Sequence, residues 1–224
     1  MPYYPSKSIG FIELKKDKMI KLDIDLLNKE LKTKTPDEII QWALTLSDNR
    51  IVTTSFGKYS AILLSTMSKH DKDIKVIWCD TLYNEPATYE HAATLIEDFD
   101  LKINKYQSLK TKAEIDATIG LPTIEDDNHA EFSEVVKLEP FRRALQEHQP
   151  DLWFTNIRVR QTELRDKKDI LSYSKDGILK ISPFYYWTDY DLDNYLEVHK
   201  LPKNHGYFDP IKALENRECG IHLQ

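Results

Sequence analysis

Cysteine is scarce in this chain, whose 224 residues contain only Cys79 and Cys219. Two thiolates cannot supply the four ligands of an ordinary iron–sulfur cluster or of a Cys₄ zinc site. They are also too few for a small secreted scaffold that is held together by disulfides. The low count therefore excludes these centres and this scaffold, and we expect a protein without a bound cofactor and without a metal.

Long apolar runs are missing as well. The first residues, MPYYPSKSIGFIELKKDKMIKLD, hold no apolar run of the kind that a signal peptide needs. No stretch approaches the roughly 18 consecutive apolar residues of a membrane span. The 31 Lys and Arg against 37 Asp and Glu give a net charge of −6, which makes general nucleic-acid binding unfavourable. We expect a cytoplasmic protein that binds neither nucleic acid nor a membrane.

The composition is that of a folded domain, with 41% hydrophobic and 30% charged residues. The sequence shows no internal repeat, no low-complexity tract and no Gly/Ser/Pro-rich linker. We therefore predict an N-terminal extension over 1–24, one domain over 25–205 and a mobile C-terminal tail over 206–224.

Apolar strand-like runs alternate with helical periodicity from Ile51 onward, which predicts an α/β fold with a doubly wound, mostly parallel, Rossmann-like sheet. Ligands bind such sheets at the carboxyl ends of the strands. The predicted strands are 51–56, 74–79, 101–106 and 152–157, then a hairpin of 170–174 and 178–182; the predicted helices are 25–31, 36–46, 60–69, 85–99, 138–149 and 188–199; a short hairpin is predicted over 9–24.

The turn after the first strand, residues 53–60, is called loop 53–60 below. Gly57 permits a tight turn, and hydroxyl groups with free amides at a helix N-terminus bind phosphate or sulfate. Lys58 adds positive charge. The pattern is not a Walker A loop, and the alternative is an ordinary turn with a hydroxyl N-cap.

The turn after the second strand carries Asp80, which is placed to orient a ribose or a base. The alternative is that Asp80 and Asn84 only cap the turn. Cys79 lies in the apolar strand before them, where a buried and inert thiol is expected.

Cations gather around the fourth predicted strand of an otherwise acidic chain. The arginine fork suits bidentate contacts with phosphate or sulfate, although such clusters can also be solvated surfaces. The cations are Lys137, Arg142, Arg143, Arg158, Arg160 and Arg165.

The chain ends with a second cysteine in a basic setting. Arg217 lies two positions before Cys219 and His222 three positions after it. Nearby cations lower a thiol pKa and favour the nucleophilic thiolate. Gly220 permits backbone freedom, so the tail could carry a reactive group into a pocket. The alternative is an incidental cysteine at a frayed terminus.

In this order the segments resemble the phosphoadenylyl-sulfate (PAPS) reductase family, which has an adenine-nucleotide α-hydrolase-like fold with a modified PP-loop. The resemblance rests on five motifs, SSSFG, DTGYxxPETY, KxEPxxRAL, W-[FI]-x-G-[LI]-R-x-x-Q-x-x-x-R and ECG[LI]H. They are matched by Thr54–Gly57, Asp80–Tyr89, Lys137–Leu145, Trp153–Arg165 and Glu218–His222.

The resemblance implies reduction of PAPS to sulfite and adenosine 3′,5′-bisphosphate in assimilatory sulfate reduction. Cys219 would attack the sulfonate sulfur and form an S-sulfocysteine, and thioredoxin or glutaredoxin would then release sulfite. It further suggests a homodimer. The substrate-binding residues that it implies are Ser55, Phe56, Gly57, Lys58, Asp80, Lys137, Arg158, Gln161, Arg165, Arg217 and His222.

The motifs also separate this chain from related classes. ATP-splitting relatives carry SGGxDS, where this chain has Phe56 and Tyr59. The CC…CxxC motif of cluster-containing APS reductases is absent, which favours PAPS. Leu82 and Asn156 replace motif glycines, and the segment 208–216 is shorter than in the family. A clusterless APS reductase and a non-catalytic nucleotide-binding relative are the alternatives.

Overall fold

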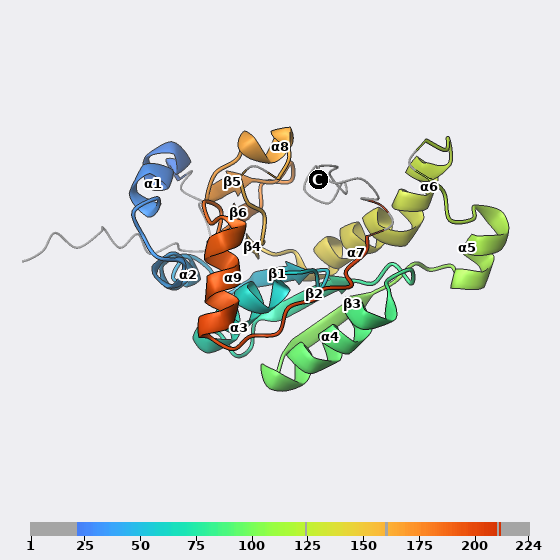
Figure 1. Ribbon diagram of the computed structural model, residues 1–224. Helices are drawn as coiled ribbons and strands as arrows, with labels where there is room; N and C mark the ends of the chain where they lie inside the picture. Colours follow the sequence, from blue (N-terminus) through green and yellow to red (C-terminus); the bar gives the residue numbers. More distant parts are fainter. Residues whose placement is uncertain (1–21, 124, 160, 210, 212–224) are drawn as a thin grey trace, which may run out of the picture.

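The computed structural model describes residues 22–123, 125–159, 161–209 and 211 (Figure 1). Most of the hairpin predicted over 9–24 lies outside these residues. The same holds for Arg160, Arg217, Cys219 and His222.

One six-stranded sheet forms the centre of the molecule, in the order β3-β2-β1-β4-β6-β5. All neighbouring strands are parallel except β5 and β6, which form the predicted hairpin. The strand order reverses between β1 and β4, so the predicted doubly wound, mostly parallel sheet is confirmed. The strands are β1 (Arg50–Thr54), β2 (Lys75–Cys79), β3 (Lys102–Tyr106), β4 (Leu152–Phe154), β5 (Leu171–Tyr173) and β6 (Leu179–Ile181).

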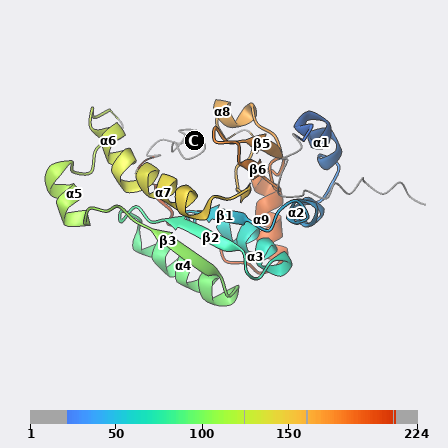
Figure 2. The same ribbon diagram turned by 180° about the vertical axis from the view of Figure 1, so that it is seen from behind.

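Helices cover both faces of the sheet. Figures 1 and 2 show α3 (Ser60–His70) and α4 (Pro86–Asp98) on one face and α7 (Glu139–His148) on the other. Alternation along the strands explains the two layers, because Val52 joins the core on the α3 face and Ile51 joins the core under α7. Helices α1 (Ile24–Leu31), α2 (Pro36–Leu44) and α9 (Asp189–Val198) complete the larger core.

Helix starts follow local sequence signals. Thr35 accepts a hydrogen bond from the Glu38 amide, and the Glu38 carboxylate accepts one from the Thr35 amide. Thr188 forms the same capping box with Asp191 at the start of α9. Such boxes satisfy amides that a helix N-terminus otherwise leaves unpaired, so both helices begin where the sequence predicts.

Several predicted boundaries are corrected at the carboxyl ends of β1 and β4 and before α7. The strands predicted over 51–56 and 152–157 end earlier, at Thr54 and Phe154, because the chain leaves the sheet there to form loops. The helix predicted over 138–149 is preceded by a π-helical turn, η1. The elements that the sequence did not predict are α5 (Lys112–Thr118), α6 (His129–Ser133), η1 (Glu134–Leu138) and α8 (Glu163–Asp166).

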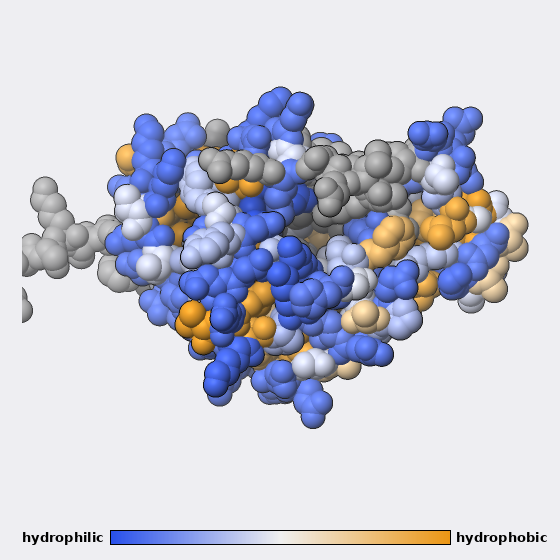
Figure 3. All heavy atoms as spheres, viewed as in Figure 1, coloured by the Kyte–Doolittle hydropathy of each residue, from blue (hydrophilic) through white to orange (hydrophobic). Residues whose placement is uncertain are grey.

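A third apolar cluster lies under α5 and α6, at the end of the molecule away from α1 (Figure 1). Ile115, Phe132, Val136 and Ile211 are buried in it. Figure 3 shows apolar surface over this end. Across the residues that the structure describes, no helix is both long and apolar enough to cross a membrane.

Candidate active site

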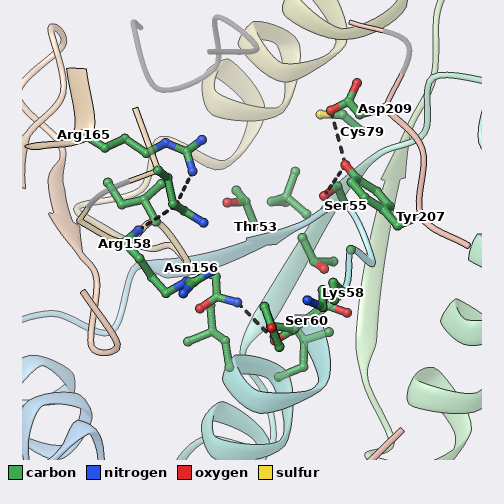
Figure 4. A pocket seen from close by; sticks show the side chains of 18 of the residues that line it. Thr53, Ser55, Lys58, Ser60, Cys79, Asn156, Arg158, Arg165, Tyr207 and Asp209 are labelled. Carbon is green, nitrogen blue, oxygen red and sulfur yellow. Dashed lines mark hydrogen bonds between the residues drawn. The ribbon is translucent and has the colours of Figure 1, made fainter. Parts of the chain in front are cut away.

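A cavity of about 430 Å³ opens at the carboxyl ends of β1 and β4, where the strand order reverses (Figure 4). This is the place where open α/β sheets bind ligands. Trp153 Nε1 donates a hydrogen bond of 2.8 Å to Thr53 Oγ1 and ties the two strand ends together beneath it. The predicted site residues that line the cavity are Ser55, Gly57, Lys58, Lys137, Arg158, Gln161 and Arg165.

Loop 53–60 is held by its own contacts and by the core. The Phe56 amide donates to Thr54 Oγ1 at 3.0 Å. Phe56 adopts a left-handed backbone with φ 50, and its ring is fully buried at 4.8 Å from the Trp78 ring. The Phe56 side chain therefore packs into the core outside the cavity lining, and a role of Phe56 in substrate binding stays a prediction.

A distant segment packs against Gly57. A Cβ atom at this position would lie 3.4 Å from the Tyr207 ring. Tyr207 Oη donates to Ser55 Oγ at 2.9 Å, so the residues after Gly206 lie directly against loop 53–60. Lys58 is exposed at the cavity rim, with its Nζ 4.7 Å from the centre of the Tyr59 ring.

The start of α3 contributes a buried hydroxyl to the cavity. Ser60 Oγ lies 3.2 Å from His91 Nε2, and burial lowers the pKa of His91. The imidazole therefore stays neutral at pH 7 and can share one hydrogen bond with the Ser60 hydroxyl.

Asp80, which the sequence predicts to bind substrate, lies outside the cavity lining. Its carboxylate is buried. Oδ1 accepts hydrogen bonds from the Leu82 amide, Asn84 and Tyr89, while Oδ2 accepts from Gln107 at 2.8 Å and lies 2.9 Å from Lys105 Nζ. Asp80 therefore organises the turn after β2, as the capping interpretation holds.

The same turn contains one departure from the family motif. Leu82 stands where the motif has glycine, and its φ is 68. A left-handed backbone is free of strain only for glycine, so the Asp80 contacts hold Leu82 in a conformation that costs on the order of 1 kcal/mol.

Replacing Asp80 by asparagine is expected to lower the free energy of unfolding by about 2–3 kcal/mol. Burial alone would raise the pKa of Asp80, but the hydrogen bonds from Lys105, Gln107 and Tyr89 outweigh it and lower that pKa. The stabilisation is thus present above the unfolded pKa of about 3.9 and is lost as the pH falls further.

Urea unfolding of the wild type and of Asp80→Asn at pH 7 and at pH 3.5 measures this effect. The difference between the two proteins should shrink at the lower pH. The matched control is Asp48→Asn, because Asp48 is fully exposed beside Arg50, and its loss should change stability by less than about 0.5 kcal/mol. A difference that does not vary with pH would contradict the role of the ionised carboxylate.

The arginine side of the cavity is organised around Gln161. Gln161 Oε1 accepts hydrogen bonds from the Arg158 amide at 2.8 Å and from Arg165 Nη1. The Arg158 guanidinium pairs with Asp189 at 2.7 Å and donates to the Trp187 carbonyl. Both guanidinium groups are therefore held in place at the end of β4, ready to contact an anion.

The opposite wall carries Lys137, presented by the π-helical turn η1. Its Nζ lies 2.6 Å from Asp209 Oδ2, and both side chains are almost fully buried. Arg142 and Arg143 lie outside the lining, where they pair with Glu134 and Glu139. The solvated or structural interpretation therefore holds for these two arginines.

The sequence did not identify two residues of this wall, Tyr207 and Asp209. Both were assigned only to the tail over 206–224. Asp209 is 72 residues from Lys137, and no periodic pattern links the two positions. The sequence marks these positions only by an aromatic and an acidic residue shortly after Gly206, which does not predict a contact with Lys137.

The family model for the phosphoadenosine phosphosulfate reductase domain matches residues 49–214. The chain belongs to this family. A phosphoadenosine 5′-phosphosulfate reductase of Xylella fastidiosa is 34% identical, over 89% of this chain and 94% of its own length. A reductase of the same name from Synechococcus is 32% identical, over 88% of this chain and 96% of its own length.

Solved structures share the fold of this chain. The crystal structure of PAPS reductase from Candida auris, in a phosphate complex, matches with a TM-score of 0.71 and 25% identity, over 87% of this chain and 92% of that chain. FMN adenylyltransferase of Candida glabrata matches at a TM-score of 0.53 and 11% identity, over 81% of this chain and 60% of that one. The adenine-nucleotide α-hydrolase-like fold predicted for this family member is thus confirmed.

The described part of this family member contains no group of three or more His, Cys, Asp or Glu side chains arranged to hold a metal ion. Cys79 is buried at the end of β2, and it borders the cavity. Among the described lining residues, cations and hydroxyls are present that can bind an anion and neutralise its charge.

Proposed function

We propose that this protein is a phosphoadenylyl-sulfate reductase that converts PAPS to sulfite and adenosine 3′,5′-bisphosphate. The observation that carries the proposal is the cavity at the reversal of strand order. There loop 53–60 lies between Lys137 on one wall and Arg158 with Arg165 on the other. A multiply anionic nucleotide needs such a combination of hydroxyls and cations.

The proposed reaction begins with the Cys219 thiolate. Its sulfur attacks the sulfonate sulfur of PAPS, the S–O bond to the phosphate breaks, and adenosine 3′,5′-bisphosphate leaves with that electron pair. The S-sulfocysteine is then attacked at the Cys219 sulfur by a thiolate of thioredoxin or glutaredoxin, and sulfite leaves. A second thiol of the reductant resolves the mixed disulfide, so the reductant is oxidised by two electrons.

The cations have a defined part in this reaction. Negative charge grows on the leaving phosphate as the S–O bond breaks, and buried cations stabilise it more strongly than water would. We assign this part to Lys137, Arg158 and Arg165, which line the same cavity as loop 53–60. Arg217 and His222 would support the thiolate of Cys219 as neighbouring cations in sequence.

The relatives support the substrate class. Curated relatives at 34% and 32% identity are named phosphoadenosine 5′-phosphosulfate reductase, and the solved Candida auris reductase is a phosphate complex. Carried over to this chain, these names favour PAPS as the substrate and an ability to bind phosphate. We further propose the division into 1–24, 25–205 and 206–224, an external dithiol protein as reductant, function without a bound cofactor, a cytoplasmic location and a homodimer.

Sulfite release with PAPS and with APS, each supplied with reduced thioredoxin, tests the proposal. We expect kcat/KM to be about a hundredfold higher with PAPS, because the 3′-phosphate adds charge-assisted contacts worth about 2–3 kcal/mol. The control omits thioredoxin and should release no sulfite, with at most one adenosine 3′,5′-bisphosphate formed per protein. Equal rates with APS would favour the clusterless APS reductase, and no turnover with either nucleotide would favour a binding protein.

A further inference from the structure

The cavity already contains an anion that belongs to the chain itself. Asp209 Oδ2 lies 2.6 Å from Lys137 Nζ, with side-chain exposures of 3% and 5%. Tyr207 Oη lies 3.2 Å from the same oxygen and 2.9 Å from Ser55 Oγ (Figure 4). The Asp209 carboxylate therefore contacts the cation, and adjoins the loop hydroxyl, that an anionic ligand of this cavity would use.

The segment that carries Asp209 is fixed at its other end by neutral contacts. Asn204 Nδ2 donates to the Phe56 carbonyl at 2.9 Å and to Thr88 Oγ1 at 3.3 Å. A Cβ atom at Gly206 would come within 2.9 Å of the Ala87 Cβ, so this position is closely packed. The chain thus enters the cavity from a fixed point, and the ion pair with Lys137 joins its acidic end to the opposite wall.

We propose that Asp209 is an intramolecular competitor for the anionic ligand and must leave Lys137 before that ligand binds. The exchange replaces one buried ion pair by another, so the desolvation of Lys137 is already complete before binding. A ligand then binds only those molecules in which Asp209 has left Lys137. Its apparent dissociation constant equals the intrinsic constant divided by the fraction of such molecules.

This exchange determines which anions occupy the cavity. Every anion that needs Lys137 is weakened by the same factor. Inorganic phosphate and sulfate have few other contacts and are excluded at concentrations where they would otherwise bind. A nucleotide that also contacts Arg158 and Arg165 on the other wall keeps a useful affinity. Asp209 therefore sets the intrinsic affinity that an anion needs in order to occupy the cavity, and only the identity of the nucleotide rests on the proposed function.

Titration calorimetry of the full chain with adenosine 3′,5′-bisphosphate, and separately with inorganic phosphate, tests this inference. We expect Asp209→Asn to bind both ligands about tenfold more tightly than the wild type, as for a competent fraction of about 10%. The matched control is Asp116→Asn, which removes one exposed carboxylate paired with Lys112 outside the cavity and should bind both ligands as the wild type does.

Weaker or unchanged binding by Asp209→Asn would overturn the inference, because it would mean that Asp209 only supports Lys137. Tyr207→Phe keeps the charge and removes the hydroxyl that helps to hold Asp209, so it should tighten phosphate binding by about threefold. If Asp209→Asn does not fold, this second variant decides, and unchanged or weaker binding then counts against the inference.

The phosphate titration also separates this inference from the proposed reaction. A wild type that reduces no PAPS, together with tighter phosphate binding by Asp209→Asn, would reject the reaction and keep the inference. A wild type that releases sulfite from PAPS, together with unchanged phosphate affinity in Asp209→Asn, would support the reaction and reject the inference.

Discussion

Replacing Cys219 by serine will reduce the rate of sulfite release from PAPS by about 10⁴-fold or more. A serine hydroxyl stays protonated at pH 7 and is a far weaker nucleophile than a thiolate, so no S-sulfocysteine forms. The affinity for adenosine 3′,5′-bisphosphate should persist, because the described cations of the cavity are untouched. Sulfite release and nucleotide titration on the same preparation measure both effects.

Intact-protein mass gives the matched control for this variant. The wild type incubated with PAPS, without thioredoxin, should gain one sulfonate group. Cys79→Ala should gain it as well, because Cys79 is a buried thiol at the end of β2. Cys219→Ser should gain none. An adduct on the serine variant, or its loss from the Cys79 variant, would contradict the assignment of the nucleophile.

Replacing Lys137 by methionine is expected to lower kcat/KM for PAPS by about 10²–10³-fold. Methionine fills a similar volume, but it cannot neutralise the charge that grows on the leaving phosphate. The loss should appear both in KM and in kcat, since the cation contacts the bound anion and the transition state alike. Steady-state kinetics with saturating thioredoxin measures the two parameters separately.

The double variant Lys137→Met with Asp209→Asn controls for the pair that the single variant breaks. Lys137 and Asp209 form a buried ion pair, and removing one partner of such a pair costs about 3–5 kcal/mol of stability. The double variant should regain most of that stability while kcat/KM stays low. Wild-type kcat/KM in the single variant would exclude Lys137 from the reaction.

The doubly wound sheet could be predicted because each of its parts has a local signal. The alternation of apolar runs with helical periodicity marks the strands and helices, and capping boxes such as Thr35 with Glu38 mark helix starts. The hairpin of β5 and β6 follows from the turn that contains Gly177, whose φ is 82. Loop 53–60 follows β1, and Arg158 and Arg165 follow β4, so their convergence in one cavity could be predicted from the parallel sheet.

The remaining features depend on contacts between distant parts of the chain. Asp80 resembles a ligand residue in sequence, and only the convergence of Lys105 and Gln107 from a neighbouring segment shows that its carboxylate is already used. The pairing of Lys137 with Asp209 is likewise long-range. Short helices such as α6 have too few residues for periodicity to identify them.

Phe56 has a consequence for how this loop can change in evolution. Its left-handed backbone costs a bulky residue on the order of 1–2 kcal/mol, whereas emptying the site of its ring beside Trp78 would cost about 3–5 kcal/mol. A single change to glycine, as in ATP-splitting loops, would therefore lose more stability than it relieves. The core beneath loop 53–60 would therefore have to be repacked before Phe56 could be replaced by the glycine of ATP-splitting relatives.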